Sequence, residues 1–133
     1  MSMLGLVLLY VGAVLIINGL SMVGKIAARE AAVMNIFTGA VSLAACFRGA
    51  FFVATPEAIM AAGQGLLFAF TYLWVAYNSL MNTDGRGIGW FSLFVAITVL
   101  PIFYWEWQAA TTVGTQWLAL NWLAWAVLWF SFV

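Results

Sequence analysis

The residues with the clearest chemical pattern are the tryptophans near the C-terminal end of the chain. The segment WLALNWLAWAVLWFSF, residues 117–132, holds four of them and no charged residue. Steps of four, three, four and three residues connect one set of bulky side chains: Leu118, Trp122, Trp125, Trp129 and Phe132. On a helix these steps place the set in one stripe. Because an indole is the largest side chain and carries one N–H donor that needs a partner, three of them along one face of an uncharged helix need either a packing or a functional explanation.

A similar ladder occupies the first apolar segment, where its side chains are mostly aliphatic. The same alternating steps connect Leu4, Leu8, Val11, Leu15, Asn18 and Met22. Beside this ladder, Gly5, Gly12 and Gly19 form a second stripe with a period of seven residues. Small residues at this period allow the backbone of a neighbouring helix to approach closely. We therefore predict a close-packed face at the glycines and an aliphatic face next to it.

The segment AAGQGLLFAFTYLWVAYNSLM, residues 61–81, carries a third ordered face of aromatic and polar groups. Gln64, Phe68 and Tyr72 share this face, and Thr71 lies beside them. A tyrosine hydroxyl inside a membrane must find a partner, on a neighbouring helix or on a molecule that passes by. Ladders of this kind are also typical of ordinary helix packing, so spacing alone leaves both interpretations open.

Composition indicates that the helices bearing these faces lie in a membrane. Of the 133 residues, 67% are hydrophobic and only 6% are charged, whereas about 25% of the residues of a soluble domain are charged. Five apolar runs each approach the roughly 20 residues that a spanning helix needs: Leu4–Gly24, Ala31–Ala54, Ala58–Met81, Ile88–Tyr104 and Trp117–Val133. The runs lack the strict alternation of membrane strands. We expect an all-α, polytopic transmembrane helix bundle with one domain, residues 1–133.

Positive charges predict the direction of the spans. Lys25 and Arg29 lie in the first break between apolar runs, and Arg86 lies in the third. The positive-inside rule places both breaks in the cytoplasm and therefore the N-terminus outside. Arg48 is the exception, because it lies within the second span. Either its side chain snorkels to the outer surface, or it pairs with Glu57 in the second break.

The ionisable and nucleophilic residues argue against several function classes. The formal net charge is zero without a basic patch, so nucleic acid is not an expected partner. Histidine, the commonest catalytic base and metal ligand, does not occur, and the single cysteine, Cys46, excludes an internal disulfide. We therefore expect neither an enzyme nor a cofactor or metal site. A coupled transporter would need a buried charge or a broken helix, for which Pro101 is the one candidate within a span.

Five segments of the chain are similar to one family. In chain order they are LGLVLLYVGAVLIINGL, AVMNIFTGAVS, GLLFAFTYLW, WFSLFVAITVLP and WLALNWLAWAVLWF, which cover nearly the whole sequence. They resemble the bacterial acid-activated urea channels and short-chain amide transporters, the AmiS/UreI family. The resemblance implies a homohexamer in the bacterial inner membrane, with a passive pore for urea or small amides in each protomer. It also implies a sixth helix with an acidic residue facing the pore, and this sequence stops before that helix.

The resemblance further implies which residues line the pore. Carried over by motif, they are Leu4, Leu8, Val11, Leu15, Phe68, Tyr72, Leu118, Trp122, Trp125, Leu128 and Trp129. These positions nearly coincide with the stripes found from spacing. Leu118 departs from the urea-channel motif, which has tryptophan at this position. The acid-gated members carry histidines in long outer loops, whereas this chain has no histidine and a short second break. We therefore expect a channel without acid gating.

An apolar, aromatic slot suits a small amide for a physical reason. Removing an unpaired amide from water costs roughly 2–7 kcal/mol, and removing a bare ion costs far more. An indole face can receive a planar amide, and the Tyr72 hydroxyl or an indole N–H can donate to its carbonyl oxygen. A collar of leucine and valine would exclude bulk water and interrupt proton transfer. The alternative is a structural, non-conducting membrane subunit whose stripes serve helix packing alone.

Overall fold

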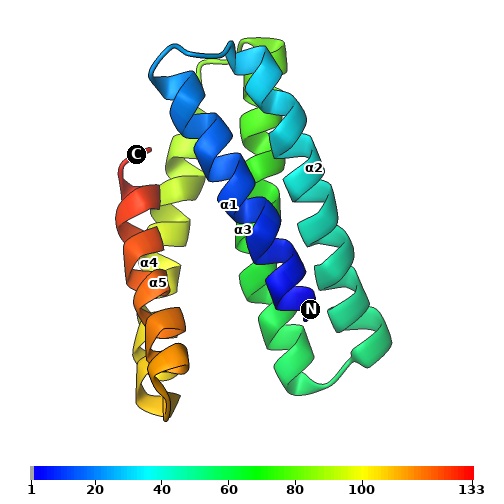
Figure 1. Ribbon diagram of the computed structural model, residues 1–133, viewed down its shortest axis with the longest axis vertical. Helices are drawn as coiled ribbons and strands as arrows, with labels where there is room; N and C mark the ends of the chain where they lie inside the picture. The colour runs from blue at the N-terminus through cyan, green and yellow to red at the C-terminus, as the bar shows by residue number, and fades with distance from the viewer. Residues whose placement is uncertain (1) are drawn as a thin grey trace. The chain divides into compact units, whose positions relative to one another are not determined.

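The computed structural model describes residues 2–133, and five α-helices account for most of this range (Figure 1). No β-strand occurs within these residues. The all-α prediction is therefore confirmed. The chain forms two compact units, Met1–Asp84 and Gly85–Val133, which are considered one at a time.

The first unit is built around α2, which packs on both of the other helices. α1 spans Met3–Met22, α2 spans Ala28–Phe47 and α3 spans Pro56–Met81. A π-helical segment, η1, spans Arg48–Val53 and extends α2 by six residues. No Cα atom of α1 lies within 8 Å of a Cα atom of α3. α1 and α3 are thus both held in place through α2.

Local hydrogen bonds explain where α3 begins and how its end is held. Thr55 caps the N-terminus, because its hydroxyl accepts a hydrogen bond of 3.2 Å from the backbone N–H of Ala58. Pro56 follows at the first helical position, where its missing N–H costs nothing. At the other end, the Arg29 guanidinium donates to the Leu80 carbonyl oxygen at 3.2 Å. This bond satisfies an end carbonyl of α3 and ties it to the start of α2.

The second unit is a pair of packed helices. α4 spans Arg86–Ala109 and continues through Pro101, and α5 spans Val113–Phe130. A capping box begins α5: the Thr112 hydroxyl accepts from the backbone N–H of Thr115 at 3.2 Å, and the Thr115 hydroxyl accepts from that of Thr112 at 3.0 Å. These bonds fix the turn between the two helices.

The fourth break between helices is shorter than its sequence suggests. Hydropathy predicts an apolar run that ends at Tyr104 and another that begins at Trp117. In the structure α4 continues to Ala109 and α5 begins at Val113, so that only residues 110–112 separate them. Glutamate, glutamine and alanine have high helix propensity without being apolar enough to mark a membrane span. Hydropathy therefore locates the apolar centre of a helix better than its end.

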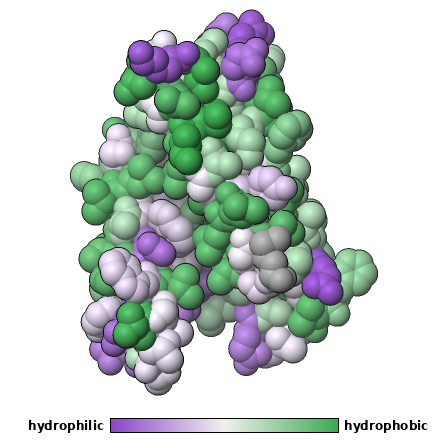
Figure 2. Space-filling model, in the orientation of Figure 1, coloured by the Kyte–Doolittle hydropathy of each residue, from purple (hydrophilic) through white to green (hydrophobic). Residues whose placement is uncertain are grey.

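Four of the helical segments are long and apolar enough to cross a membrane: α1, α2 with η1, α3 and α4. Most of their residues are not buried within the protein. Apolar side chains accordingly make up much of the face seen in Figure 2. α5 has 18 residues and does not meet the same criterion, since its tryptophan, asparagine, glutamine and threonine residues lower its mean hydropathy. That α5 also spans the membrane stays a prediction.

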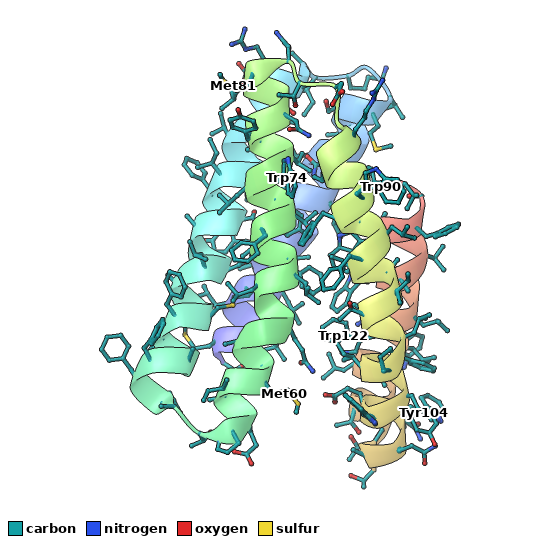
Figure 3. All side chains as sticks on the ribbon, turned by 180° about the vertical axis from the view of Figure 1, so that it is seen from behind. Met60, Trp74, Met81, Trp90, Tyr104 and Trp122 are labelled. Carbon is teal, nitrogen blue, oxygen red and sulfur yellow. The ribbon has the colours of Figure 1, made fainter. Side chains whose placement is uncertain are left out.

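Aromatic side chains mark both ends of α4. Trp90 lies near its start and Tyr104 near its end, as Figure 3 shows, and they are 73% and 59% exposed. Trp105 is also exposed. Exposed aromatic residues at the two ends of a spanning helix are typical of the headgroup regions of a bilayer. Arg48, at the start of η1, and Glu57, in the first turn of α3, are both exposed, and no ion pair between them is found in residues 2–133.

A close helix contact occurs at a glycine outside the predicted glycine stripe. A Cβ atom at Gly39 would lie 2.6 Å from Leu73 Cγ and 3.3 Å from the Ala69 carbonyl oxygen, so α2 and α3 approach closely there. At Gly12 and Gly19 a Cβ atom would meet nothing within 4 Å. The neighbour predicted for this part of the stripe is therefore not α2 or α3 of the same unit.

We expect Gly39→Ala to destabilise the protein, because its methyl group would overlap the branched carbon of Leu73. Overpacking of this kind costs about 1–3 kcal/mol, which should lower the melting temperature in detergent by about 5 °C or more. Gly63→Ala is the matched control, because Gly63 is exposed on α3 and a Cβ atom there meets nothing within 4 Å. Equal melting temperatures for the two variants would show that the packing of α2 on α3 does not depend on the close approach at Gly39.

Candidate functional site

The predicted lining residues of α1 differ widely in exposure. Val11 is buried, with 4% of its surface exposed, and Leu8 is partly exposed. Leu4 and Leu15 are exposed, at 57% and 38%. The same ladder continues to Asn18, whose carboxamide bonds to α2. The aliphatic face thus borders α2 along one side and leaves Leu4 and Leu15 accessible.

The predicted lining residues of α3 lie at its middle and are buried. Phe68 is 7% exposed and Tyr72 is 6% exposed. Beside them, the Thr71 hydroxyl donates a 2.6 Å hydrogen bond to the Leu67 carbonyl oxygen of its own helix. The hydroxyl proton is therefore already used. Of this group, the Tyr72 hydroxyl is the better candidate for a contact with a passing polar molecule.

The tryptophans of α5 form a partly buried aromatic face. The Trp122 and Trp125 rings are 5.1 Å apart between centroids and meet edge to face at 84°. Such geometry is favoured because the positive edge of one ring faces the negative face of the other. Trp129, one turn further, is 4% exposed, whereas Leu118 and Leu128 are 41% and 37% exposed. The contact agrees with the stripe inferred from spacing.

A buried polar face of α2 was missed by sequence reasoning. Asn35 and Thr38 are fully buried, and Ser42 is 1% exposed. The Thr38 hydroxyl lies 3.3 Å from the Tyr10 carbonyl oxygen of α1 and donates to it. These three residues have the three- and four-residue steps of a helical stripe, and polar side chains inside an apolar span usually bond to a neighbouring helix. Polar residues in helical steps within an apolar span were therefore the sequence signal that could have identified this buried face.

Nothing in the described residues forms a metal site, since no group of three or more candidate ligand side chains comes together among them. An apolar groove lies at the end of α2 and is lined by Ala44, Phe47, Arg48 and Phe52. It contains none of the predicted lining residues. Those residues are instead distributed over α1 and α3 of the first unit and α5 of the second.

The family of the chain follows from comparison with known proteins. A family model described as AmiS/UreI family transporter matches residues 3–133. The chain belongs to the AmiS/UreI family. The resemblance found in its five sequence segments is thereby confirmed. Members of a transporter family are not enzymes, which agrees with the expectation that the chain is not one.

Several relatives of known name match nearly all of this AmiS/UreI chain. A protein from Mycolicibacterium smegmatis, named as a candidate amidate-substrates transporter, is 45% identical and covers 95% of this chain and 58% of its own length. The candidate transporter protein AmiS2 of Rhodococcus erythropolis is 40% identical over 94% of this chain and 60% of its own. The acid-activated urea channel of Helicobacter pylori is 37% identical over 97% of this chain and 80% of its own length. The chain therefore spans less than two thirds of the first two relatives.

Two solved structures have the same fold as this AmiS/UreI chain. The cryo-EM structure of the Helicobacter pylori urea channel in its closed state superposes with a TM-score of 0.88 and 37% identity. The crystal structure of that channel gives a TM-score of 0.86 and 38% identity. Each match covers 97% of this chain and 78% of the other. The helical fold is thus that of a urea channel.

Proposed function

We propose that this chain forms a passive channel for urea or short-chain aliphatic amides in the bacterial cytoplasmic (inner) membrane. The observation that carries the proposal is the aromatic face of α5, where Trp122 and Trp125 meet edge to face beside the buried Trp129. These indoles lie in a helix without a charged residue. The similarity to a urea channel and to named amide transporters supports the same cargo class.

The proposed pore lies within each protomer and is narrow and largely apolar. Its lining combines the aliphatic face of α1, the Phe68 and Tyr72 face of α3 and the tryptophan face of α5. An ion would lose its hydration against such walls without compensation, whereas a neutral amide loses far less. Indole faces and the Tyr72 hydroxyl would return part of the lost hydrogen bonding. Because these contacts are weak, the molecule can also leave, as conduction requires.

The proposed channel is a homohexamer with its N-terminus outside. The positions of Lys25, Arg29 and Arg86 support this direction, because these residues flank the ends of spans that the positive-inside rule assigns to the cytoplasm. The exposed apolar surfaces of α1 support a contact with lipid or with another copy. Family resemblance supports six copies.

The test is the entry of urea and acetamide into proteoliposomes, measured at pH 7.5 and at pH 5. We expect entry several-fold faster than into protein-free vesicles, and little changed by acid. Histidine is the side chain whose unperturbed charge changes in this range, and the chain has none. Glu57 and Glu106 are both exposed, so water can solvate their charges.

Glu57→Gln and Glu106→Gln serve as controls for the pH comparison. A several-fold rise in entry on acidification that either substitution abolishes would identify a carboxylate sensor and contradict the ungated channel. Entry no faster than into protein-free vesicles would instead favour the structural, non-conducting subunit.

A further inference from the structure

The aliphatic ladder of α1 ends at a pair of asparagine side chains. The Asn18 amide nitrogen donates to the Asn35 amide oxygen at 3.1 Å, and the Asn35 nitrogen donates to the Asn18 oxygen at 2.6 Å. The two carboxamides therefore form a closed, reciprocal pair that joins α1 to α2. Urea and acetamide carry the same arrangement of a carbonyl oxygen beside an amino group, so either could pair with a carboxamide in the same way.

Asn35 is the fixed member of the pair. It is fully buried, and its amide nitrogen makes a second hydrogen bond of 2.9 Å to the Ala31 carbonyl oxygen. A carbonyl can only accept, so this bond determines which atom of the Asn35 side chain is nitrogen. The orientation of Asn18 then follows from its partner. With both of its N–H groups used, Asn35 has no donor left for another molecule.

Asn18 is the member with hydrogen-bonding capacity left. A carboxamide has two N–H donors and two acceptor lone pairs, and the bonds to Asn35 use one of each. No further bond of the Asn18 side chain is found in residues 2–133. Asn18 is partly exposed, in contrast to Asn35. One donor and one acceptor thus remain, on the two opposite edges of an oriented amide.

Asn18 lies where a permeant could use its remaining hydrogen-bonding groups. It follows Leu15 by three residues and continues the ladder of Leu4, Leu8, Val11 and Leu15, which puts it on the same stripe of the helix. It also lies one turn before the end of α1 at Met22. A molecule that has lost water along the aliphatic part of this stripe would next meet an amide.

We propose that Asn18 is a specificity-determining residue that receives the amide group of the permeant at the end of the apolar stripe, and that Asn35 positions it. The proposal rests on the proposed channel function. The remaining N–H of Asn18 would donate to the carbonyl oxygen of the permeant, or its remaining lone pair, on the opposite edge of the amide, would accept from an N–H of the permeant. Urea presents N–H groups on both sides of its carbonyl, whereas acetamide presents them on one side and a methyl group on the other, so urea can reach the Asn18 lone pair in more orientations.

The decisive measurement is the ratio of urea permeability to acetamide permeability in proteoliposomes, compared between wild type and Asn18→Leu/Asn35→Leu. Removing both partners leaves no unpaired polar group, so the helices should still pack. We expect the ratio to fall by about threefold to tenfold, the effect of one hydrogen bond. The ratio does not depend on how many pores are functional. An unchanged ratio would overturn the proposal and leave the pair as a packing contact.

Two further variants keep the test interpretable. Thr38→Val removes another α1–α2 hydrogen bond, from Thr38 to the Tyr10 carbonyl oxygen, with little change in shape. Its ratio should equal that of wild type, and an equal fall in both variants would contradict the assignment to Asn18. If the double variant does not assemble, the ratio of Asn18→Ser decides by the same criterion. A wild-type protein without any urea or acetamide entry would refute the channel itself, which is a separate outcome.

Discussion

Trp125→Ala should change the ratio of urea to acetamide entry, or the entry of either, by about tenfold. The edge-to-face contact between Trp122 and Trp125 holds both rings in place, and such a contact is worth about 0.5–1.5 kcal/mol beyond the area that it buries. Alanine removes this contact together with an entire indole face. The slot would become wider and less flat at that point, and Trp122 would lose the ring that orients it.

Trp105→Ala is the matched control for this measurement. Trp105 lies near the end of α4 and is 61% exposed, as expected for a residue of the headgroup region. The same side chain is thus removed at a place with no proposed contact to the permeant. Vesicles with equal amounts of assembled protein should show near wild-type entry for Trp105→Ala. Equal, small effects from both substitutions would contradict a pore role for Trp125.

The sequence predicted the helical stripes better than the contacts between helices. Tryptophans in three- and four-residue steps share a face on any regular helix, and the contact of Trp122 with Trp125 follows directly from that geometry. Which helix covers a face depends on packing that periodicity does not describe. The exposure of Leu4 beside the burial of Val11, on one stripe, is an example.

The glycines illustrate the same limit. Gly12 and Gly39 are both small residues within apolar spans, but only Gly39 has another helix of the chain against it. α2 has small residues at Ala32, Gly39 and Cys46, also seven apart, so the period alone does not identify the packed face. The asparagine pair could not be predicted from either sequence segment by itself, since it needs the register of α1 against α2.

Gly12→Leu should prevent stable assembly of the oligomer while the protomer still folds. Leucine has a higher helix propensity than glycine, and a Cβ atom at Gly12 meets nothing within 4 Å, so neither the helix nor the packing of the first unit opposes a side chain there. Gly12 and Gly19 lie on α1 with the exposed Leu9 and Ile16, which are 60% and 67% exposed. If a second copy packs on this face, a leucine at Gly12 would force the two backbones apart.

The measurement is the molecular mass of the purified particle in detergent, determined for wild type, Gly12→Leu and Gly63→Leu. Gly63 is also exposed with free space at its Cβ position, but it lies on α3, outside the predicted stripe. We expect a smaller particle for Gly12→Leu alone, with a helical content equal to that of wild type. An intact oligomer that still passes urea or acetamide would show that lipid rather than another copy covers this face of α1. The loss of folded protein in Gly12→Leu would show instead that the glycine supports the protomer itself, and would equally contradict its role between copies.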